Sequence, residues 1–153
     1  MNRFENKVVL ITGSGGGLGK ASALRFVEEG ARVVIADIDL ESAEAVADEI
    51  GPQAKAIKAD VTSIDDCKAM VQTAQDIYGQ LNVVFANAGV GGNKTEFVDM
   101  SIEEWDRVVD VNLRGMMLTC KASVPALIEA GGGALVLMGS STCLLYTSPS
   151  PRD

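Results

Sequence analysis

The sequence predicts an α/β fold, a doubly wound parallel sheet with helices on both faces. Short runs rich in valine, isoleucine and alanine alternate along the chain with segments whose apolar residues recur at helical spacing. Glycines stand at many of the junctions between them. The 153 residues, 47% of them hydrophobic, suffice for one packed domain.

Three strand–helix pairs are expected in the first half of the chain. Each strand is a short apolar or β-branched run, and each helix ends at a glycine. The expected strands cover residues 7–12, 31–36 and 55–59, and the expected helices cover residues 17–29, 39–51 and 63–79.

Two further strands and one long helix are expected in the second half. The fourth strand covers residues 81–86 and the fifth covers residues 134–138. Between them, Ser101 and Glu104 match the S-x-x-E capping box that begins a helix. Apolar residues then recur at helical spacing as far as Met117. The chain therefore contains strands one to five of a sheet that we expect to be incomplete.

Composition excludes several classes of protein. The chain has no histidine, which rules out a Ser-His or Cys-His nucleophile pair and a His-ligated zinc. Its three cysteines form no C-x-x-C pair, so neither a metal site nor a disulfide framework is expected. The net charge of -8 argues against a nucleic-acid partner. The first seven residues run straight into a short apolar segment, and no apolar stretch approaches the ~20 residues of a membrane span, so a soluble cytoplasmic protein is expected.

A glycine-rich turn follows the first strand and leads into a helix. Residues 12–19 read TGSGGGLG, so backbone N–H groups and a helix N-terminus meet where a diphosphate could bind. Glycine lets a ligand approach the backbone, although such turns also occur for steric reasons alone. A triphosphate-binding loop of the G-x-x-x-x-G-K-[ST] type is excluded, because Ser14 stands at its first position and Ala21 follows Lys20.

Asp37 stands directly after the second strand. An acidic side chain there can accept hydrogen bonds from the ribose hydroxyls of an adenosine, although it could instead cap the following helix. Its charge would repel a 2′-phosphate, and Ser14, Gly15 and Ile38 supply no positive charge to offset that repulsion. We therefore expect NAD to be preferred over NADP.

Together with further motifs, these features resemble the short-chain dehydrogenase/reductase family over residues 6–142. The turn at 12–19 matches T-G-x-x-x-G-x-G, residues 60–61 match the pair that contacts adenine, and residues 87–89 match the N-A-G motif. The resemblance implies a Rossmann-like sheet that binds a nicotinamide dinucleotide, and no metal. The cofactor-binding residues that it implies are Thr12, Gly13, Ser14, Gly17, Leu18, Gly19, Asp37, Asp60, Val61, Asn87, Ala88 and Gly89.

The same resemblance implies catalytic roles for Asn112 and Ser141. Ser141 would orient the substrate oxygen and Asn112 would support a proton path, although both could be ordinary polar residues. The family's Tyr-x-x-x-Lys pair, the general acid/base, would fall beyond Asp153. Tyr146 cannot replace that tyrosine, because no lysine stands four residues later. We therefore expect this fragment to be inactive and catalysis to belong to the complete parent protein.

The last eleven residues, CLLYTSPSPRD, differ in composition from the rest. They are rich in serine and proline, continue no strand or helix pattern, and resemble the in-frame translation of a sequencing-library adapter. We expect a partial NAD-binding domain at residues 1–142 and a non-native tail at residues 143–153. A genuine divergent tail is the alternative.

For the complete protein, the resemblance implies an NAD-dependent oxidoreductase that transfers a hydride between nicotinamide and a secondary alcohol or ketone. It also implies a homodimer or homotetramer with a small-molecule substrate. The alternative is a non-catalytic regulator that binds a dinucleotide on the same fold. Ser141 and Asn112 favour the enzyme, because such a regulator has no evident need for them.

Overall fold

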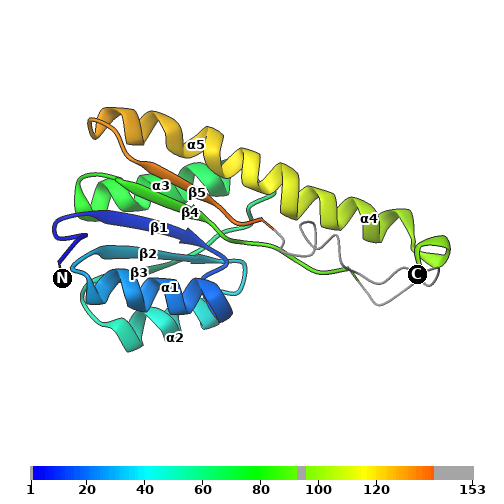
Figure 1. The fold of residues 1–153 in the computed structure, drawn as a ribbon, viewed down its shortest axis with the longest axis horizontal. Coiled ribbons are helices and arrows are strands. Elements are labelled where there is room, and N and C mark those ends of the chain that lie inside the picture. Colours follow the sequence, from blue (N-terminus) through cyan, green and yellow to red (C-terminus); the bar gives the residue numbers. More distant parts are fainter. Residues whose placement is uncertain (1, 93–95, 140–153) are drawn as a thin grey trace, which may run out of the picture.

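A computed structural model of the chain describes residues 2–92 and 96–139. Its parallel strands lie in the order β3-β2-β1-β4-β5, with helices on both faces, so the predicted doubly wound α/β fold is confirmed (Figure 1). The strands are β1 Val8–Thr12, β2 Arg32–Asp37, β3 Ala54–Lys58, β4 Val83–Ala86 and β5 Ala134–Leu137. The helices are α1 Gly17–Glu28, α2 Leu40–Ile50, α3 Ile64–Tyr78, α4 Ile102–Val109 and α5 Met116–Glu129, with a 3-10 turn η1 at Phe97–Asp99 and a π-helical segment η2 at Asp110–Gly115.

The central strands β1, β2 and β4 are largely buried on both faces of the sheet, whereas the edge strand β5 is exposed along its length. Helices α1 and α2 pack on one face, and α3 with α5 pack on the other (Figure 1). Successive residues of β1 alternate between these two cores: Val8 and Leu10 contact the α3/α5 side, whereas Val9 and Ile11 contact the α1/α2 side. A strand covered in this way is apolar at every position, which is why β1 has no polar alternation.

The strand order reverses at β1. After β3 the chain crosses back to the other side of β1, so β2 and β4 are its two neighbours. The loops that leave β1 and β4 therefore diverge at the carboxyl ends of these strands. In open parallel sheets this is the place where ligands bind.

The predicted long helix from Ser101 is interrupted by a π-helical segment. Its start is as expected, because the Ser101 side chain accepts a hydrogen bond from the Glu104 N–H at 3.1 Å. At Asp110–Gly115, however, the backbone changes to π-helical geometry before α5 continues the same rod (Figure 1). Such segments are rare and are found mostly at functional sites. Here the segment carries Asn112.

A buried carboxylate, Glu29, connects the N-terminal segment with α1. Its side chain is only 4% exposed and accepts hydrogen bonds from the guanidinium groups of Arg3 at 2.9 Å and Arg25 at 2.7 Å. The hydrogen bond from Arg3 is the main reason why the pKa of Glu29 lies below its ordinary value. The ionised form of Glu29 therefore favours the folded state.

We expect Glu29→Gln to destabilise the fold at neutral pH, whereas Glu28→Gln, at an exposed neighbouring pair with Arg25, should have little effect. Because the folded-state pKa of Glu29 is lowered, its stabilisation is complete above the unfolded-state pKa of ~4.3 and is lost as pH falls through the folded-state pKa. Urea unfolding of the three chains at descending pH tests this. If the difference in the free energy of unfolding between wild type and Glu29→Gln stays constant far below that pH, the prediction is wrong.

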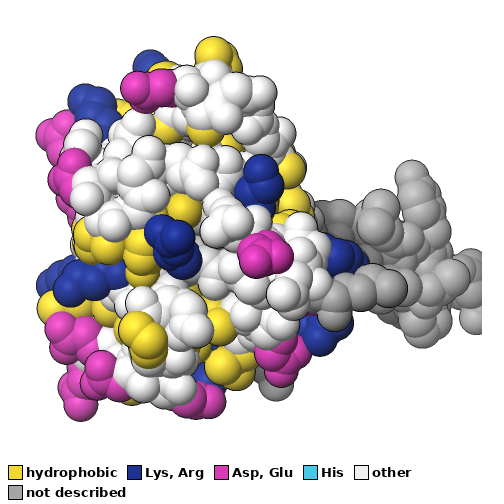
Figure 2. Space-filling view, turned by 90° about the vertical axis from the view of Figure 1, so that its left-hand side faces the viewer, with side chains coloured by type: hydrophobic (Ala, Val, Ile, Leu, Met, Phe, Trp, Pro, Cys, Tyr) yellow, Lys and Arg dark blue, Asp and Glu magenta, His cyan; other side chains and the backbone are white. Residues whose placement is uncertain are grey.

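The surface differs from one side of the molecule to another. At the end where the strands begin, acidic and basic side chains are interspersed among hydrophobic ones (Figure 2). The α4–η2–α5 rod, by contrast, carries large exposed apolar side chains along its length. They are Ile102, Trp105, Leu113, Met117, Val124 and Ile128. Among the described helices, none is long and apolar enough to cross a membrane.

Candidate functional site

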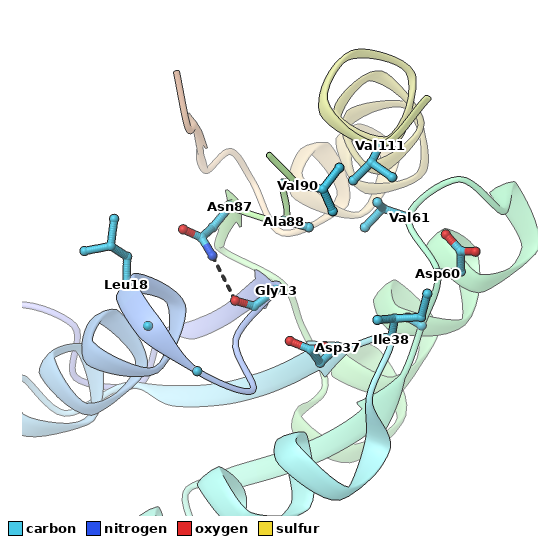
Figure 3. Close-up of a pocket in the computed structure, with 14 residues that line it drawn as sticks. Gly13, Leu18, Asp37, Ile38, Asp60, Val61, Asn87, Ala88, Val90 and Val111 are labelled. Carbon is cyan, nitrogen blue, oxygen red and sulfur yellow. Dashed lines mark hydrogen bonds between the residues drawn. The ribbon is translucent and has the colours of Figure 1, made fainter. Parts of the chain in front are cut away.

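A cavity of about 410 Å³ opens where the strand order reverses, at the carboxyl ends of the central strands (Figure 3). Its walls come from the glycine turn after β1, the end of β2, the loops after β3 and β4, and η2. Nine of the predicted cofactor-binding residues line it, together with five others. The lining residues are Gly13, Gly16, Gly17, Leu18, Asp37, Ile38, Ala59, Asp60, Val61, Asn87, Ala88, Gly89, Val90 and Val111.

The glycine turn is shaped by close packing at two of its positions. Gly13 has a φ of +63°, and a Cβ placed there would lie 2.7 Å from the Cα of Ala88. A Cβ at Gly19 would overlap the Gly13 carbonyl oxygen and lie 2.7 Å from the Cα of Ser14. A side chain at Gly13 would displace the loop after β4, and one at Gly19 would push α1 away from the turn. These two glycines are therefore required by the fold of the turn itself.

The first turn of α1 faces the cavity without a side-chain cap. Gly16 occupies the N-cap position and provides no capping side chain, and the first turn has no acidic residue. A Cβ at Gly16 or Gly17 would meet no atom within 4 Å, so the space in front of the turn is open. Unpaired N–H groups at a helix N-terminus favour an anion. This part of the cavity can hold a phosphate or diphosphate group.

Thr12 and Asn87 connect the end of β1 with the end of β4. The Thr12 hydroxyl accepts hydrogen bonds from the N–H groups of Asn87 at 3.1 Å and Ala88 at 3.0 Å. In return, the Asn87 side-chain amide donates to the carbonyl groups of Thr12 and Gly13, both at 3.0 Å (Figure 3). The two strand ends are thus held at a fixed separation, which positions both walls of the cavity.

Ser14 supports the turn from behind. Its side chain is fully buried, donates to the Ile11 carbonyl group at 2.7 Å and accepts from the Ala36 N–H at 3.1 Å. It therefore bridges β1 and β2 and does not line the cavity. Thr12 and Gly19, also expected at the cofactor, likewise lie behind the cavity wall and shape it.

Asp37 ends β2 and lines the cavity. Its two carboxylate oxygens accept hydrogen bonds from the Gly15 N–H at 2.9 Å and the Asp39 N–H at 3.1 Å. The cap of α2 is Asp39, whose side chain accepts from Glu41, so the alternative interpretation of Asp37 as the helix cap is wrong. Each oxygen of Asp37 keeps acceptor capacity for a further donor, such as a hydroxyl group.

Asp60 shapes the loop after β3. One of its oxygens accepts from both the N–H and the hydroxyl group of Thr62, each at 2.8 Å, and its own N–H donates to Asp66 at 2.9 Å. This loop carries Val61 to the cavity, where it lies near Val90 and Val111 (Figure 3). The cavity thus has an apolar end made by three valines from three different segments.

Asn112 lies on η2 and holds the loop that follows β4. Its side-chain oxygen accepts from the Val90 N–H at 2.8 Å, and its side-chain amide donates to the Val90 carbonyl group at 2.9 Å. Arg107 donates to the next carbonyl group, that of Gly91, at 3.0 Å. Asn112 does not line the cavity. Its predicted catalytic partner Ser141 lies outside the described residues.

Several lining residues were not predicted from the sequence. Ile38 is 62% exposed at the cavity rim, as is the predicted Leu18 at 68%, and a ligand would cover both. Ile38 was not among the predicted cofactor-binding residues, although the sequence places it where a 2′-phosphate would lie, because it directly follows the acid that ends β2. Val90 and Val111 could not have been found, because only folding brings them next to Val61.

The parallel sheet, the switch point and the open helix N-terminus together define a Rossmann-type nucleotide-binding fold. Comparison with protein families gives the narrower class. The model described as short chain dehydrogenase matches residues 7–150, and this chain belongs to that family. The matched range includes residues 143–150 of the predicted non-native tail, which lie outside the described residues, so the boundary at residue 142 stays a prediction.

Curated relatives include two named dehydrogenases. Cyclohexanol dehydrogenase from Acinetobacter sp. (strain SE19) is 44% identical over 147 residues, which are 94% of this chain and 59% of that protein. Galactitol 2-dehydrogenase from Agrobacterium fabrum (strain C58 / ATCC 33970) is 39% identical over 139 residues, 90% of this chain and 54% of that protein. The chain thus spans somewhat more than half the length of these relatives.

Solved structures of the family superpose closely. A 3-ketoacyl-(acyl-carrier-protein) reductase from Brucella melitensis, complexed with NADH, has a TM-score of 0.81 and 41% identity, covering 84% of this chain and 53% of that one. A short-chain type dehydrogenase/reductase from Mycobacterium marinum has a TM-score of 0.89 and 32% identity, covering 97% of this chain and 61% of that one. A nicotinamide dinucleotide is therefore a ligand of a close structural neighbour.

Proposed function

We propose that this chain forms the NAD-binding part of an oxidoreductase that transfers a hydride between nicotinamide and a secondary alcohol or ketone. The observation that carries the proposal is the arrangement of one cavity with an uncapped helix N-terminus at Gly17 and the Asp37 carboxylate. The helix N-terminus suits a diphosphate, and the Asp37 carboxylate suits the hydroxyl groups of a ribose. The cyclohexanol and galactitol dehydrogenases among the relatives support an alcohol as substrate.

The residues present fit an NAD molecule. Gly16 and Gly17 leave open space before the helix amides, which would hold the diphosphate. Asp37 would accept hydrogen bonds from the ribose hydroxyls, and Val61 with Asp60 would contact the adenine. Asn87, Ala88 and Gly89 would line the opposite wall. When bound, the nicotinamide would supply or accept the hydride.

We expect Asp37→Ser to change the preference from NADH toward NADPH by about tenfold or more, because it removes a carboxylate that repels the 2′-phosphate. The measurement is the ratio of the two dissociation constants, obtained by titrating each reduced cofactor against the chain. Asp65→Ser, at an exposed position of α3, removes the same charge outside the cavity and is the control. An unchanged ratio in Asp37→Ser would show that Asp37 does not select the cofactor.

The catalytic part of the proposal rests on residues beyond the cavity. Asn112 acts in the described structure as a positioning residue, because both of its polar groups bind the Val90 backbone. We propose that Ser141 orients the substrate in the complete protein, that the Tyr-x-x-x-Lys pair follows this chain, and that the 153-residue chain alone does not turn over. Residues 143–153 would then be a non-native tail behind a partial domain at 1–142.

We further propose a homodimer or homotetramer for the complete protein. The exposed apolar side chains of the α4–η2–α5 rod, such as Trp105 and Ile128, are the support for this assembly. A cytoplasmic location is proposed as well. It is supported by Cys67 and Cys120, which are free thiols, as in proteins of a reducing compartment.

A further inference from the structure

Gly115 ends the π-helical segment η2 and is buried against the loop after β3. A Cβ at Gly115 would lie 2.7 Å from Cγ2 and 3.1 Å from Cβ of Val61, and 3.3 Å from the Asp110 carbonyl oxygen. The first distance is shorter than real Cβ contacts. The Val61 side chain thus occupies the space in which any other residue at position 115 would place its own side chain.

The Val61 side chain can move in few directions to make room for a side chain at position 115. Its side chain is β-branched, so rotation about χ1 is restricted, and the residue is 8% exposed. Its loop is held by the hydrogen bonds of Asp60 to Thr62 and Asp66, and its carbonyl group accepts from the Cys67 thiol at 3.4 Å. The cavity, which Val61 lines, is the open space beside it. A side chain pushed away from η2 would therefore move into the cavity.

The carbonyl group of Gly115 is held in place as well. The Thr119 hydroxyl donates to it at 2.9 Å, and Thr119 is buried. Thr119 lies on the same rod, so this bond fixes the local geometry of the rod at Gly115. The π-helical segment itself is tied to the loop after β4 by the two hydrogen bonds between the Asn112 side chain and the Val90 backbone, and a shift of η2 away from Val61 would strain them. Neither Val61 nor the Gly115 backbone can therefore move away from the other without a cost in packing or hydrogen bonding.

We propose that Gly115 is a positioning residue for the cofactor, because its missing side chain lets Val61 pack against η2 and keeps the apolar end of the cavity open. The inference rests on the proposed function and extends it to a residue that does not itself line the cavity. It also gives the π-helical segment a role besides carrying Asn112: it brings the glycine backbone against Val61.

The test is a titration of the 153-residue chain with NADH, using Gly115→Ala, Val61→Ala and the double variant. Gly115→Ala should weaken NADH binding about tenfold, and the double variant should restore it to within about twofold of Val61→Ala alone. Leu113→Ala, at an exposed position of η2, is the matched control and should bind as wild type does. Thermal unfolding, followed in parallel, shows whether each variant is folded.

The outcomes separate this inference from the proposed function. Alanine is a better helix former than glycine, so a purely local effect at position 115 would not weaken binding. Wild-type affinity in Gly115→Ala, or a double variant as weak as Gly115→Ala, would overturn the role of Gly115. If Gly115→Ala does not fold, recovery of folding and binding in the double variant supports the overlap, and loss of folding in both overturns it. A wild-type chain that does not bind NADH contradicts the proposed function itself, and with it this inference.

Discussion

Gly19→Ala is expected to abolish measurable NADH binding and to destabilise the fold by about 3 kcal/mol. The added Cβ overlaps the Gly13 carbonyl oxygen and approaches the Ser14 backbone to 2.7 Å and the Asn87 side-chain nitrogen to 2.9 Å. Two of these three contacts are with backbone, which cannot rotate away. The helix must therefore separate from the turn, which displaces its N-terminus from the cavity.

The control for Gly19→Ala is Gly16→Ala in the same turn. Gly16 has an extended backbone with a φ of −169°, and a Cβ there meets no protein atom within 4 Å, so the stability should be nearly unchanged. Urea unfolding gives the stability of both variants, and NADH titration gives the binding of Gly19→Ala. Equal stability of the two variants would show that the turn tolerates a side chain at Gly19 and that its packing is not tight.

Thr12→Val is expected to cost about 2–4 kcal/mol of folding stability. Valine keeps the shape of threonine but removes the acceptor for the N–H groups of Asn87 and Ala88, which leaves two donors unpaired. Because the Thr12 hydroxyl joins β1 to β4 behind the cavity wall, NADH binding should weaken too.

Thr12→Ser separates the hydroxyl group from the methyl group. It keeps the acceptor and loses one buried methyl, so its cost should be about 1 kcal/mol. Urea unfolding of Thr12→Val and Thr12→Ser in parallel measures the difference. A valine variant as stable as wild type, or a serine variant less stable than the valine variant, would show that packing of the methyl group matters at this position and the two hydrogen bonds do not.

The strands and most helices were predictable because their signals are local. The β-branched run of β1 and the Ser63 and Asp39 caps of α3 and α2 each determine an element without reference to distant residues. The π-helical segment was not predictable. Its apolar residues keep helical spacing, and its contacts with the loops after β3 and β4 join residues that are far apart in the sequence.

Positions in the candidate site were predictable for glycines of the turn and for residues at the end of a strand. Gly13, Gly17 and Asp37 meet in the cavity as expected. Ser14 shows the limit, because its position in the turn does not reveal that its side chain points back between β1 and β2. The pairing of Asn112 with Val90 depends on the register between η2 and a loop, which no local pattern records.

We propose above all that the cavity at the switch point binds NAD, and that Asp37 makes the site prefer NAD over NADP. The most direct test is a titration of the unsubstituted 153-residue chain with NADH and, side by side, with NADPH. Saturable binding of NADH, with NADPH at least about tenfold weaker, is the result that the structure predicts. Binding of neither cofactor, or equal binding of both, would contradict it.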